Sequence, residues 1–434
     1  MSPGGPTRPA KTASPSYRWA VFGLLSAGYF LVYFHRLAPA VVAVDLMRDL
    51  HASGPLMGLL ASAYFYPYAL MQVPTGLMSD SVGPRRTICL CFILAGLGSL
   101  LFVPAESPGL VLAARALVGL GVSTAFVCSL KLFTRWFAPS EFSTTVGLYL
   151  SVGALGALCA GAPLAWMSAG LGWRAAFGII GLATLAVTLG MWLVVRDDPR
   201  EKGLPPAEGL AEQVGASART MPLGQALRRV FSTGNFWPCG LWMFCVSGVY
   251  FSLGGLWGGP YLRHVHGFSA HESGLVLSLM SLGMLIGSPF MSFVSDRVYR
   301  ARRPVLLQQV LLLAAMFAVL AFFPAGLGVF GLSVWFFLFG VVAGSGPVAA
   351  FSAVKEMFPL GISGTALGLT NLFPFLGGAG LQFVSGLILE AFGRTGENFT
   401  PAGYAAMFAL YAVLMLAAAV AAWRFQETFG VRAG

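Results

Sequence analysis

This sequence has few charged residues and no cluster of cysteines, and each of these absences excludes a class of protein. Only 10% of the 434 residues are charged, whereas soluble proteins carry roughly a quarter. With 57% hydrophobic residues and a mean hydropathy of +0.78, the chain is expected to be a polytopic membrane protein. The six cysteines all lie within apolar segments, which predicts small packing residues and neither a disulfide framework nor a metal site.

Catalytic patterns are missing as well. The sequence contains no HExxH, no pair of aspartates within the apolar runs and no nucleophile beside a base, so we expect no enzyme, no metal site and no cofactor. The net charge of +10 does not indicate a nucleic-acid partner, because the basic residues stand in short segments between apolar runs, where they set membrane orientation. The expected partners are the lipid bilayer and a small molecule.

Apolar runs bounded by charged residues, glycine and proline predict an all-α membrane protein with twelve spanning helices in two sets of six. We expect a cytoplasmic tail at 1–17, the first six-helix bundle at 18–196, a cytoplasmic linker at 197–235, the second bundle at 236–425 and a second tail at 426–434. Lysine and arginine concentrate on the side of both termini, which predicts that both termini are cytoplasmic.

The two halves of the sequence repeat one another. The stretch from Gly58 to Arg86 parallels the stretch from Gly274 to Arg303. Asp80 and Asp296 therefore occupy equivalent places after the second helix of each half. Parallel six-helix repeats are typical of transporters, whose substrate lies between the halves near the middle of the membrane.

Three motifs at matching places in this frame resemble those of the major facilitator superfamily. One runs from Gly76 to Arg86, although Ser81 and Pro84 depart from the family pattern. The others are RALVGLG at 115–121 and GWRAAF at 172–177. The resemblance covers nearly the whole chain and implies two pseudo-symmetric bundles that work by alternating access. The stretch 195–204 is also similar to the linker entry of the organic-anion and sugar-phosphate branches.

Arg36 places a guanidinium inside the apolar first helix, in the stretch YFLVYFHRLAP at 29–39. An arginine near a helix centre costs roughly 2.5–3.5 kcal/mol on insertion scales, so such residues usually face a cavity and mark a pathway. Tyr29, Tyr33 and Arg36 share one face of the helix, and together they offer an anion a guanidinium fork and phenol donors. The acids of the chain lie at helix ends or in loops, so an internal salt bridge to Arg36 is the weaker alternative.

The sugar-phosphate branch is expected to carry a second arginine on the symmetric seventh helix, and this chain lacks it there. Aligning residues 37–39 with 258–260 puts Trp257 opposite Arg36. One arginine beside an aromatic wall favours an organic carboxylate over a phosphate ester. Two alternatives stay open: an exporter of neutral or amphipathic compounds, with Arg36 structural, and a ligand sensor that does not transport.

A conformational latch is predicted after the second helix of each half. Asp80 stands at a helix end near Arg85 and Arg86, so that opposite charges would pair in one state and separate in the other. The alternative is that these basic residues only fix membrane orientation. The expected gating residues are Gly76, Asp80, Gly83, Arg85, Arg86, Asp296 and Arg297.

Three further basic residues have more than one reading. Lys131 either snorkels to the membrane surface or draws an anion inward from Arg36. Arg115 either takes part in proton coupling or braces the fourth helix, which are the two roles that the family resemblance implies. His35 has an unperturbed pKa near neutrality, so it either carries a proton or packs as a hydrogen-bonded histidine. Coupling to a proton, to a counter-anion or to neither is therefore open.

Aromatic and amide side chains of other helices are expected to complete the binding site. The predicted substrate-binding residues are Arg36, Tyr29, Tyr33, His35, Tyr64, Tyr68, Lys131, Tyr250, Trp257 and Asn371. We expect a monomer in the inner membrane of a bacterium that transports a small organic anion.

Overall fold

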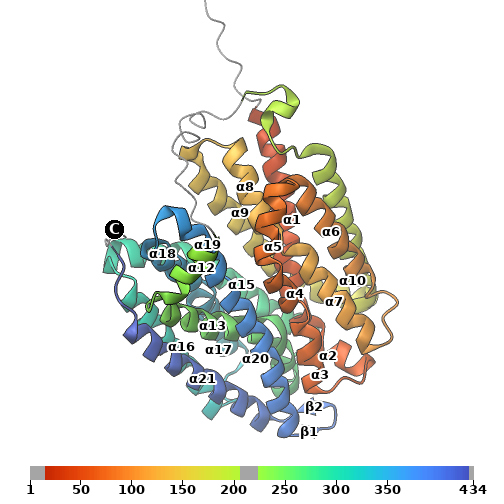
Figure 1. The fold of residues 1–434 in the computed structure, drawn as a ribbon. Coiled ribbons are helices and arrows are strands. Elements are labelled where there is room, and N and C mark those ends of the chain that lie inside the picture. Colours follow the sequence, from red (N-terminus) through yellow and green to blue (C-terminus); the bar gives the residue numbers. More distant parts are fainter. Residues whose placement is uncertain (1–14, 206–222, 430–434) are drawn as a thin grey trace, which may run out of the picture.

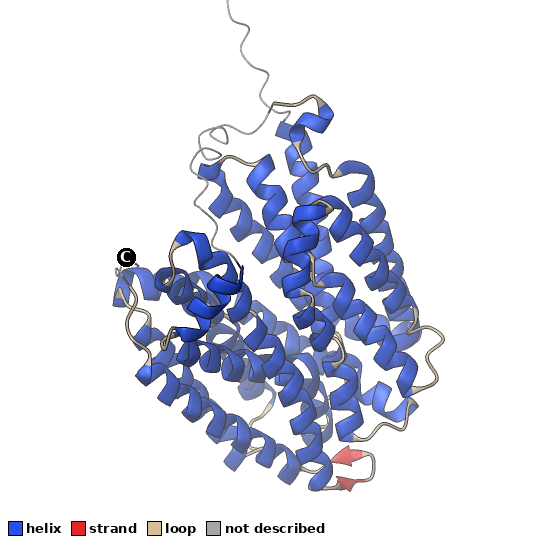
Figure 2. Cartoon of the chain, viewed as in Figure 1, coloured by secondary structure: helices blue, strands red, loops and turns tan. Residues whose placement is uncertain are grey.

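The computed structural model describes residues 15–205 and 223–429 and is almost entirely helical (Figures 1 and 2). Nine of its helices in the described ranges are long and apolar enough to cross a membrane, and the remaining spans are built from shorter helices. The expected all-α architecture of two bundles is confirmed. The expected tail residues 1–14 and 430–434, and the linker residues 206–222, lie outside the described residues.

The first half contains six spans, several of which are interrupted. Its helices are α1 (Pro15–Leu37), α2 (Pro39–Asp49), α3 (Gly54–Ser62), α4 (Phe65–Leu70), α5 (Gln72–Ser81), α6 (Pro84–Leu100), α7 (Pro108–Val122), α8 (Ala125–Trp136), α9 (Pro139–Cys159), α10 (Ala162–Val194) and the 3₁₀ turn η1 (Pro199–Lys202). Gly172 in α10 has φ 81° and ψ 154°, which ends the fifth span and lets the sixth begin at Trp173.

The second half contains the other six spans and three π-helical turns. Its elements are α12 (Leu223–Ser232), α13 (Phe236–Ser252), η2 (Leu253–Trp257), α14 (Gly258–His266), α15 (Ala270–Phe293), η3 (Val294–Tyr299), α16 (Arg303–Phe322), α17 (Val329–Phe339), η4 (Gly340–Gly344), α18 (Pro347–Met357), α19 (Leu360–Thr370), α20 (Leu372–Ala391), β1 (Arg394–Thr395), β2 (Asn398–Phe399) and α21 (Pro401–Arg424). The strands β1 and β2 pair antiparallel.

Proline accounts for the breaks in the first two spans. Because proline has no N–H and clashes with the preceding turn, a helix weakens before it. The first span breaks at Ala38, before Pro39, and the second breaks near Tyr64 and again at Met71, upstream of Pro67 and Pro74. Each break leaves backbone carbonyls without a helical donor inside the bundle.

The two ends of the molecule differ. We name the end where α1 begins and α21 finishes the linker end, and the opposite end, which carries β1 and β2, the hairpin end (Figure 1). At the hairpin end the halves are packed together, with α2 and α3 against α14 and α20, and with α9 and α10 against α15. The backbones nearly touch there: a Cβ on Gly259 would lie 1.7 Å from the carbonyl oxygen of Ala40.

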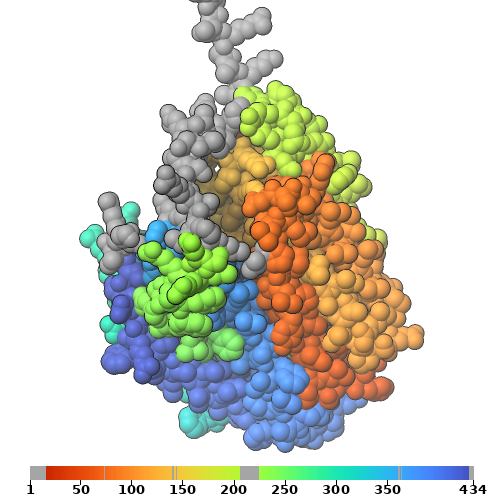
Figure 3. Space-filling view, viewed as in Figure 1, coloured from red at the N-terminus to blue at the C-terminus, as the bar shows by residue number. Residues whose placement is uncertain are grey.

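At the linker end the halves separate. Among the described residues, α5 and α8 of the first half do not pack closely on α18 or α19 of the second. Figure 3 shows a hollow between the halves at this end. The structure is therefore closed at the hairpin end and open at the linker end.

Candidate functional site

Arg36 lies on the last turn of α1, immediately before the break at Ala38. Its side chain is buried, with 4% of the residue exposed. The second half meets the first here, because a Cβ on Gly255 in η2 would lie 3.6 Å from the backbone oxygen of Arg36. Arg36 is thus held at the interface of the two halves, on the inner side of the closed hairpin end.

Four aromatic rings surround this guanidinium, and we call them the aromatic cage. The Arg36 Cζ atom lies 4.8 Å from the ring centroid of Tyr33, 5.1 Å from Tyr68, 5.4 Å from Phe251 and 5.1 Å from Phe375. Tyr33 and Tyr68 belong to the first half, whereas Phe251 and Phe375 belong to the second. Cation–π contacts at such distances are worth about 0.5–1 kcal/mol each, and about 2 when desolvated, so the cage stabilises the positive charge across the interface.

The cage supplies no negative charge, and its acceptors are the neutral phenol oxygens of Tyr33 and Tyr68. Within the described ranges, none of the ion pairs or hydrogen bonds involves the Arg36 guanidinium, and its Nε is buried without a partner. A buried polar group that lacks a hydrogen bond costs about 1–3 kcal/mol, and more when it is charged. A carboxylate at the edge of the guanidinium would accept paired N–H bonds and neutralise the charge.

The tyrosines predicted around Arg36 divide into two groups. Tyr33 and Tyr68 are cage residues. Tyr29 stacks on Tyr149 of α9 with centroids 4.2 Å apart and meets Tyr33 edge-on at 5.3 Å, so it packs α1 against α9 behind the cage. Tyr64 stacks on Tyr68 at 5.8 Å and is fully buried. Tyr29 therefore supports Tyr33, whereas the phenol of Tyr64, like that of Tyr68, lies beside the Arg36 guanidinium.

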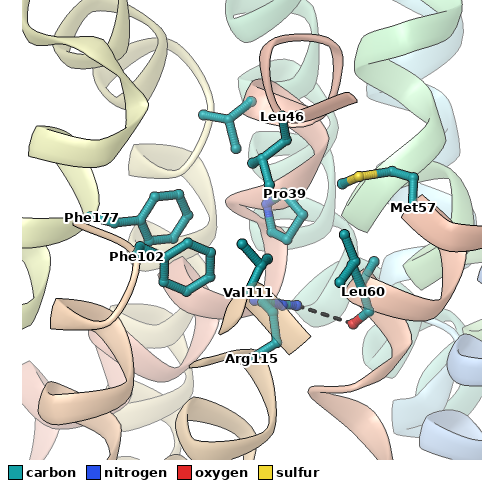
Figure 4. Close-up of a pocket in the computed structure, with 10 residues that line it drawn as sticks. Pro39, Leu46, Met57, Leu60, Phe102, Val111, Arg115 and Phe177 are labelled. Atoms are coloured by element: carbon teal, nitrogen blue, oxygen red, sulfur yellow. Dashed lines mark hydrogen bonds between the residues drawn. The ribbon is translucent and has the colours of Figure 1, made fainter. Parts of the chain in front are cut away.

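Arg115 sits where the first two spans break. Pro39 has no N–H to give to the carbonyl of His35, and Arg115 donates to that oxygen at 2.9 Å. It also donates to the carbonyl of Ala61 at 3.3 Å, drawn as the dashed line in Figure 4, and its Cζ lies 4.9 Å from the ring of Tyr64. These hydrogen bonds tie the fourth span to the first two, which supports the interpretation that Arg115 braces the fourth span.

The pocket in Figure 4 is not suited to an anion. It lies within the first half on the hairpin side of Arg115, and its other nine lining residues are apolar. They include Phe102, Val111 and Phe177. Since Arg115 already donates to two carbonyls, an anion there would meet few free donors. The interface around Arg36 is the better candidate site.

Two residues predicted to bind substrate point away from the cage and need correction. His35 is fully buried within the first half, with Nε2 3.3 Å from Thr184 Oγ1 of α10. Trp257 turns toward the hairpin end, where its indole donates to the carbonyl of Gln382 at 3.0 Å and its ring meets Phe399 edge-on. A helix presents only one face to the cavity, and both side chains lie off that face.

Tyr250 and Asn371 lie next to the cage. Tyr250 packs edge-on against Phe251, with centroids 5.7 Å apart. Asn371 Nδ2 donates to Oε1 of Gln72 at 3.2 Å, which joins the two halves one helical turn beyond Tyr68. Phe251 and Phe375 were not predicted, although Phe251 adjoins Tyr250 and Phe375 lies one turn after Asn371.

The predicted latch at the linker end has different partners. Asp80 forms its ion pair with Lys131, which also donates to the carbonyl of Ser79 at 2.7 Å, and not with Arg85 or Arg86. Arg85 donates instead to the carbonyl of Trp192 and lies over its indole ring, 4.7 Å from the centroid. Lys131 is thereby engaged at the linker end, as the snorkelling alternative expects.

In the second half, Asp296 and Arg297 were predicted as gating residues without a stated pairing. Asp296 pairs with Arg302 and not with Arg297, which is exposed. Arg302 also pairs with Glu356 of α18 at 2.7 Å. The sequence reasoning missed Arg302, although it stands in the loop equivalent to that of Arg86.

Each half also carries a carboxylate that caps the helix after this loop. Asp197 accepts the backbone N–H of Arg85 at 2.8 Å, and Gly83, with φ 97°, brings the loop so close that a Cβ would lie 2.5 Å from Asp197 Oδ2. Glu427 accepts the N–H groups of Arg302 and Arg303 at 2.8 and 3.0 Å. We call these contacts the Asp197 clamp and the Glu427 clamp; the predicted gating residue Gly76, by contrast, has open space around it.

At the hairpin end, charged side chains join the halves. Arg263 of α14 pairs with Asp45 of α2 at 3.3 Å. Glu390 of α20 accepts the backbone N–H of Gly54 at 2.7 Å and pairs with Arg394 at 2.9 Å. These contacts belong to the closed state of this end.

Comparisons with known proteins identify the family and the fold. A model of the Major Facilitator Superfamily matches residues 25–379 and 256–432. A probable sulfoacetate transporter of Cupriavidus necator is 27% identical over 289 residues, which cover 65% of this chain and 66% of that transporter. The hexuronate transporter of Escherichia coli is 25% identical over 423 residues, with 94% and 93% covered, and a probable galactarate/D-glucarate transporter of Bacillus subtilis is 24% identical over 429 residues, with 92% of each covered.

Solved structures share the fold. A bacterial homolog of the human lysosomal transporter Spinster, in an inward-facing and unoccupied conformation, aligns with a TM-score of 0.75 at 20% identity and covers 94% of this chain and 97% of its own. A D-xylose–proton symporter aligns with a TM-score of 0.73 at 17% identity, with 96% and 100% covered. Because the family model matches most of its length, this chain belongs to the Major Facilitator Superfamily of membrane transporters.

Proposed function

We propose that this transporter moves a small organic anion, with a carboxylate favoured over a phosphate ester, and that Arg36 binds the anionic group. The observation that carries the proposal is the buried Arg36 guanidinium, which lies between the two halves and has no carboxylate partner in the described structure. An anion would supply the missing charge and acceptors at the place where both halves meet.

The single positive charge supports a carboxylate. Among the other basic residues near the interface, Lys131 is paired with Asp80 and Arg115 donates to two carbonyls. A phosphate ester carries close to two negative charges at neutral pH, and Arg36 alone would leave one of them in a cage of low polarity. The relatives named above, a hexuronate transporter and probable transporters of sulfoacetate and of galactarate or glucarate, support an acidic substrate, but several of these substrates are dianions and do not separate a carboxylate from a phosphate ester.

Alternating access would convert this closed hairpin end into an open one. If both termini are cytoplasmic, as the distribution of lysine and arginine predicts, the hollow at the linker end would face the cytoplasm and this would be the inward-facing state. The cage joins rings of both halves, so it cannot keep this form when the halves rock apart at the hairpin end. For coupling we favour exchange of anions or uniport over ordinary proton symport, because the described acids of the spans lie near helix ends and His35 is fully buried within the first half, beside Thr184.

The test is a ligand screen on purified protein followed by uptake into vesicles. A ligand at 100 times its dissociation constant raises the free energy of unfolding by about 2.7 kcal/mol, so carboxylates, phosphate esters, amino acids and neutral drugs can be ranked by thermal stabilisation. The best anion is then tested for uptake. We expect Arg36→Ala to abolish both effects, and Arg36→Lys to weaken binding by about 10-fold or more, since lysine keeps the charge but loses the planar fork.

Arg200→Ala is the matched control, because Arg200 is an arginine with 73% of its side chain exposed at the linker end. It should leave both measurements unchanged. A neutral compound that stabilises a folded Arg36→Ala protein would contradict the proposal and favour an exporter. Anion binding without uptake into vesicles would favour a sensor.

A further inference from the structure

A surface groove lies on the second half, away from Arg36 and on the outside of the bundle. The helices α13 and α21, which lie side by side, form its walls together with Phe373 of α20 (Figure 1). Its lining is apolar except at one end, and consists of Trp237, Pro238, Leu241, Phe244, Phe373, Ala417, Val420, Ala421 and Arg424. The small side chains Ala417 and Ala421 leave the hollow between the larger ones. Its length runs along the membrane-spanning direction, so in a bilayer it faces lipid.

The charged end of the groove is at the linker end. Arg424 ends α21, its side chain is exposed, and it is the one charged residue among the groove residues. Exposed Trp423 and Trp237 flank it, with 63% and 50% of each residue exposed. Tryptophan and arginine together mark the level of the headgroups, where an indole is half in hydrocarbon and a guanidinium meets phosphate.

The amphipathic helix α12 brings two further arginines to the same end. Ala226 and Val230 are buried against the bundle, whereas Arg228 and Arg229 are exposed. The end of α12 is fixed to the groove: Trp237 Nε1 donates to the carbonyl of Phe231 at 3.0 Å, and their rings stack with centroids 5.8 Å apart.

A reciprocal pair of hydrogen bonds holds this end together. The amide of Asn235, between α12 and α13, donates to the carbonyl of Gln426 at 3.0 Å and accepts the N–H of Gln426 at 2.8 Å. The segment that follows α12 and the segment that follows α21 are thereby joined, so Arg228, Arg229 and Arg424 all lie at the linker end of the second half. The nearby carboxylate of Glu427 is directed to the backbone N–H groups of Arg302 and Arg303, and among the described residues it forms no ion pair with Arg228, Arg229 or Arg424.

We propose that this groove binds an anionic phospholipid, with an acyl chain along α13 and α21 and its phosphate between Arg424 and the arginines of α12. The apolar lining of the groove favours an acyl chain, and the arginines favour an anionic headgroup over a zwitterionic one. Each basic residue near a membrane surface contributes an electrostatic attraction that corresponds to about five-fold in affinity. The site is independent of the anion proposed for Arg36.

Native mass spectrometry of the detergent-purified full chain tests this site, with phosphatidylglycerol and phosphatidylcholine added at equal concentrations. We expect preferential retention of phosphatidylglycerol and a matching thermal stabilisation. Arg424→Gln should weaken that retention about five-fold. Arg200→Gln, which removes an exposed arginine at the same end but outside the groove, should leave it unchanged. Ala417→Phe, at an exposed position, should fill the groove and reduce retention of both lipids.

Several results would overturn the proposal. Equal retention of the two lipids by the parent protein would show that the protein does not select an anionic headgroup. Equal losses of retention in Arg424→Gln and Arg200→Gln would show that the lipid does not bind at this groove. Glycerol phosphate tests the source of the phosphate group: stabilisation by this soluble headgroup equal to that by the lipid would show a simple anion site without a role for the groove. Unchanged lipid retention in folded Ala417→Phe would show the same.

Discussion

Replacing Gly259 with alanine should shift the transporter away from the state seen here. The added Cβ would lie 1.7 Å from the carbonyl oxygen of Ala40 in the opposite half, whereas Cβ contacts under 3.0 Å essentially do not occur. The halves would have to part by about 1.3 Å at the hairpin end, the difference between these two distances. Backbone atoms on the Ala40 side cannot rotate out of the way as a flexible side chain can.

Overpacking of a close contact costs typically about 1–3 kcal/mol. The steric cost falls only on the state that is closed at the hairpin end, so the equilibrium between the two states should move by about 5-fold to 150-fold toward opening of that end. The overall fold should survive, because the contact is between halves and not within one.

Distances between spin labels measure this shift. Glu106 and Glu397 are exposed residues in loops of opposite halves at the hairpin end and can be replaced by labelled cysteines. In Gly259→Ala we expect a population at longer distance that the parent lacks. Gly380→Ala is the matched control, since its Cβ would meet open space while the gain in helix propensity is the same. An unchanged distance distribution in a folded Gly259→Ala protein would refute the reasoning.

Three other predictions concern the charged residues. Arg115→Leu should lower the free energy of unfolding by about 1–3 kcal/mol, because the carbonyl of His35 loses its donor whereas that of Ala61 keeps the N–H of Tyr64; thermal unfolding measures the loss, with Arg115→Lys as the milder variant. Asp45→Asn removes the pair with Arg263, a partly exposed pair worth about 0–1 kcal/mol, so the hairpin-end label distances should lengthen slightly at low salt and match the parent at high salt. Partial desolvation opposes ionisation of Glu427, but the N–H groups it accepts hold its pKa below the usual value, so its stabilising contribution is present above about pH 4.5 and is lost as the pH falls further. Glu427→Gln should therefore unfold at a lower temperature at pH 7 and lose less stability than the parent between pH 5 and pH 3.

The sequence predicted the parts of this structure that depend on composition and local pattern. The apolar runs, the repeat and the motifs sufficed for the all-α architecture with twelve spans, and the isolated Arg36 pointed to the interface. The breaks within the helices were not predicted, although their cause was visible in the sequence. Pro39 lies inside an apolar run, and hydropathy alone predicts one continuous helix across it. Hydropathy reports where a chain lies in the membrane, and it does not report whether its backbone hydrogen bonds are continuous.

Pairings between distant residues were less accessible. Asp80 has Arg85 and Arg86 near it in sequence, yet its partner is Lys131, because the end of α8 passes beside α5 and brings an amine within reach. The rings of Phe251 and Phe375 were missed since phenylalanine in an apolar helix carries no local mark of function. Which helix face turns inward depends on packing between helices, and a single sequence fixes that only loosely.

The Asp197 clamp and the Glu427 clamp bear on how the two halves are joined as a chain. Each clamp ties the end of its half back onto a loop of the same half, one before residues 206–222 and the other near the end of the described chain. Neither needs a residue from across the interface. A proteolytic cut within 206–222 should thus leave two fragments that each stay folded. Co-expression of residues 1–205 and 223–434 as two separate polypeptides should likewise reconstitute the complete transporter.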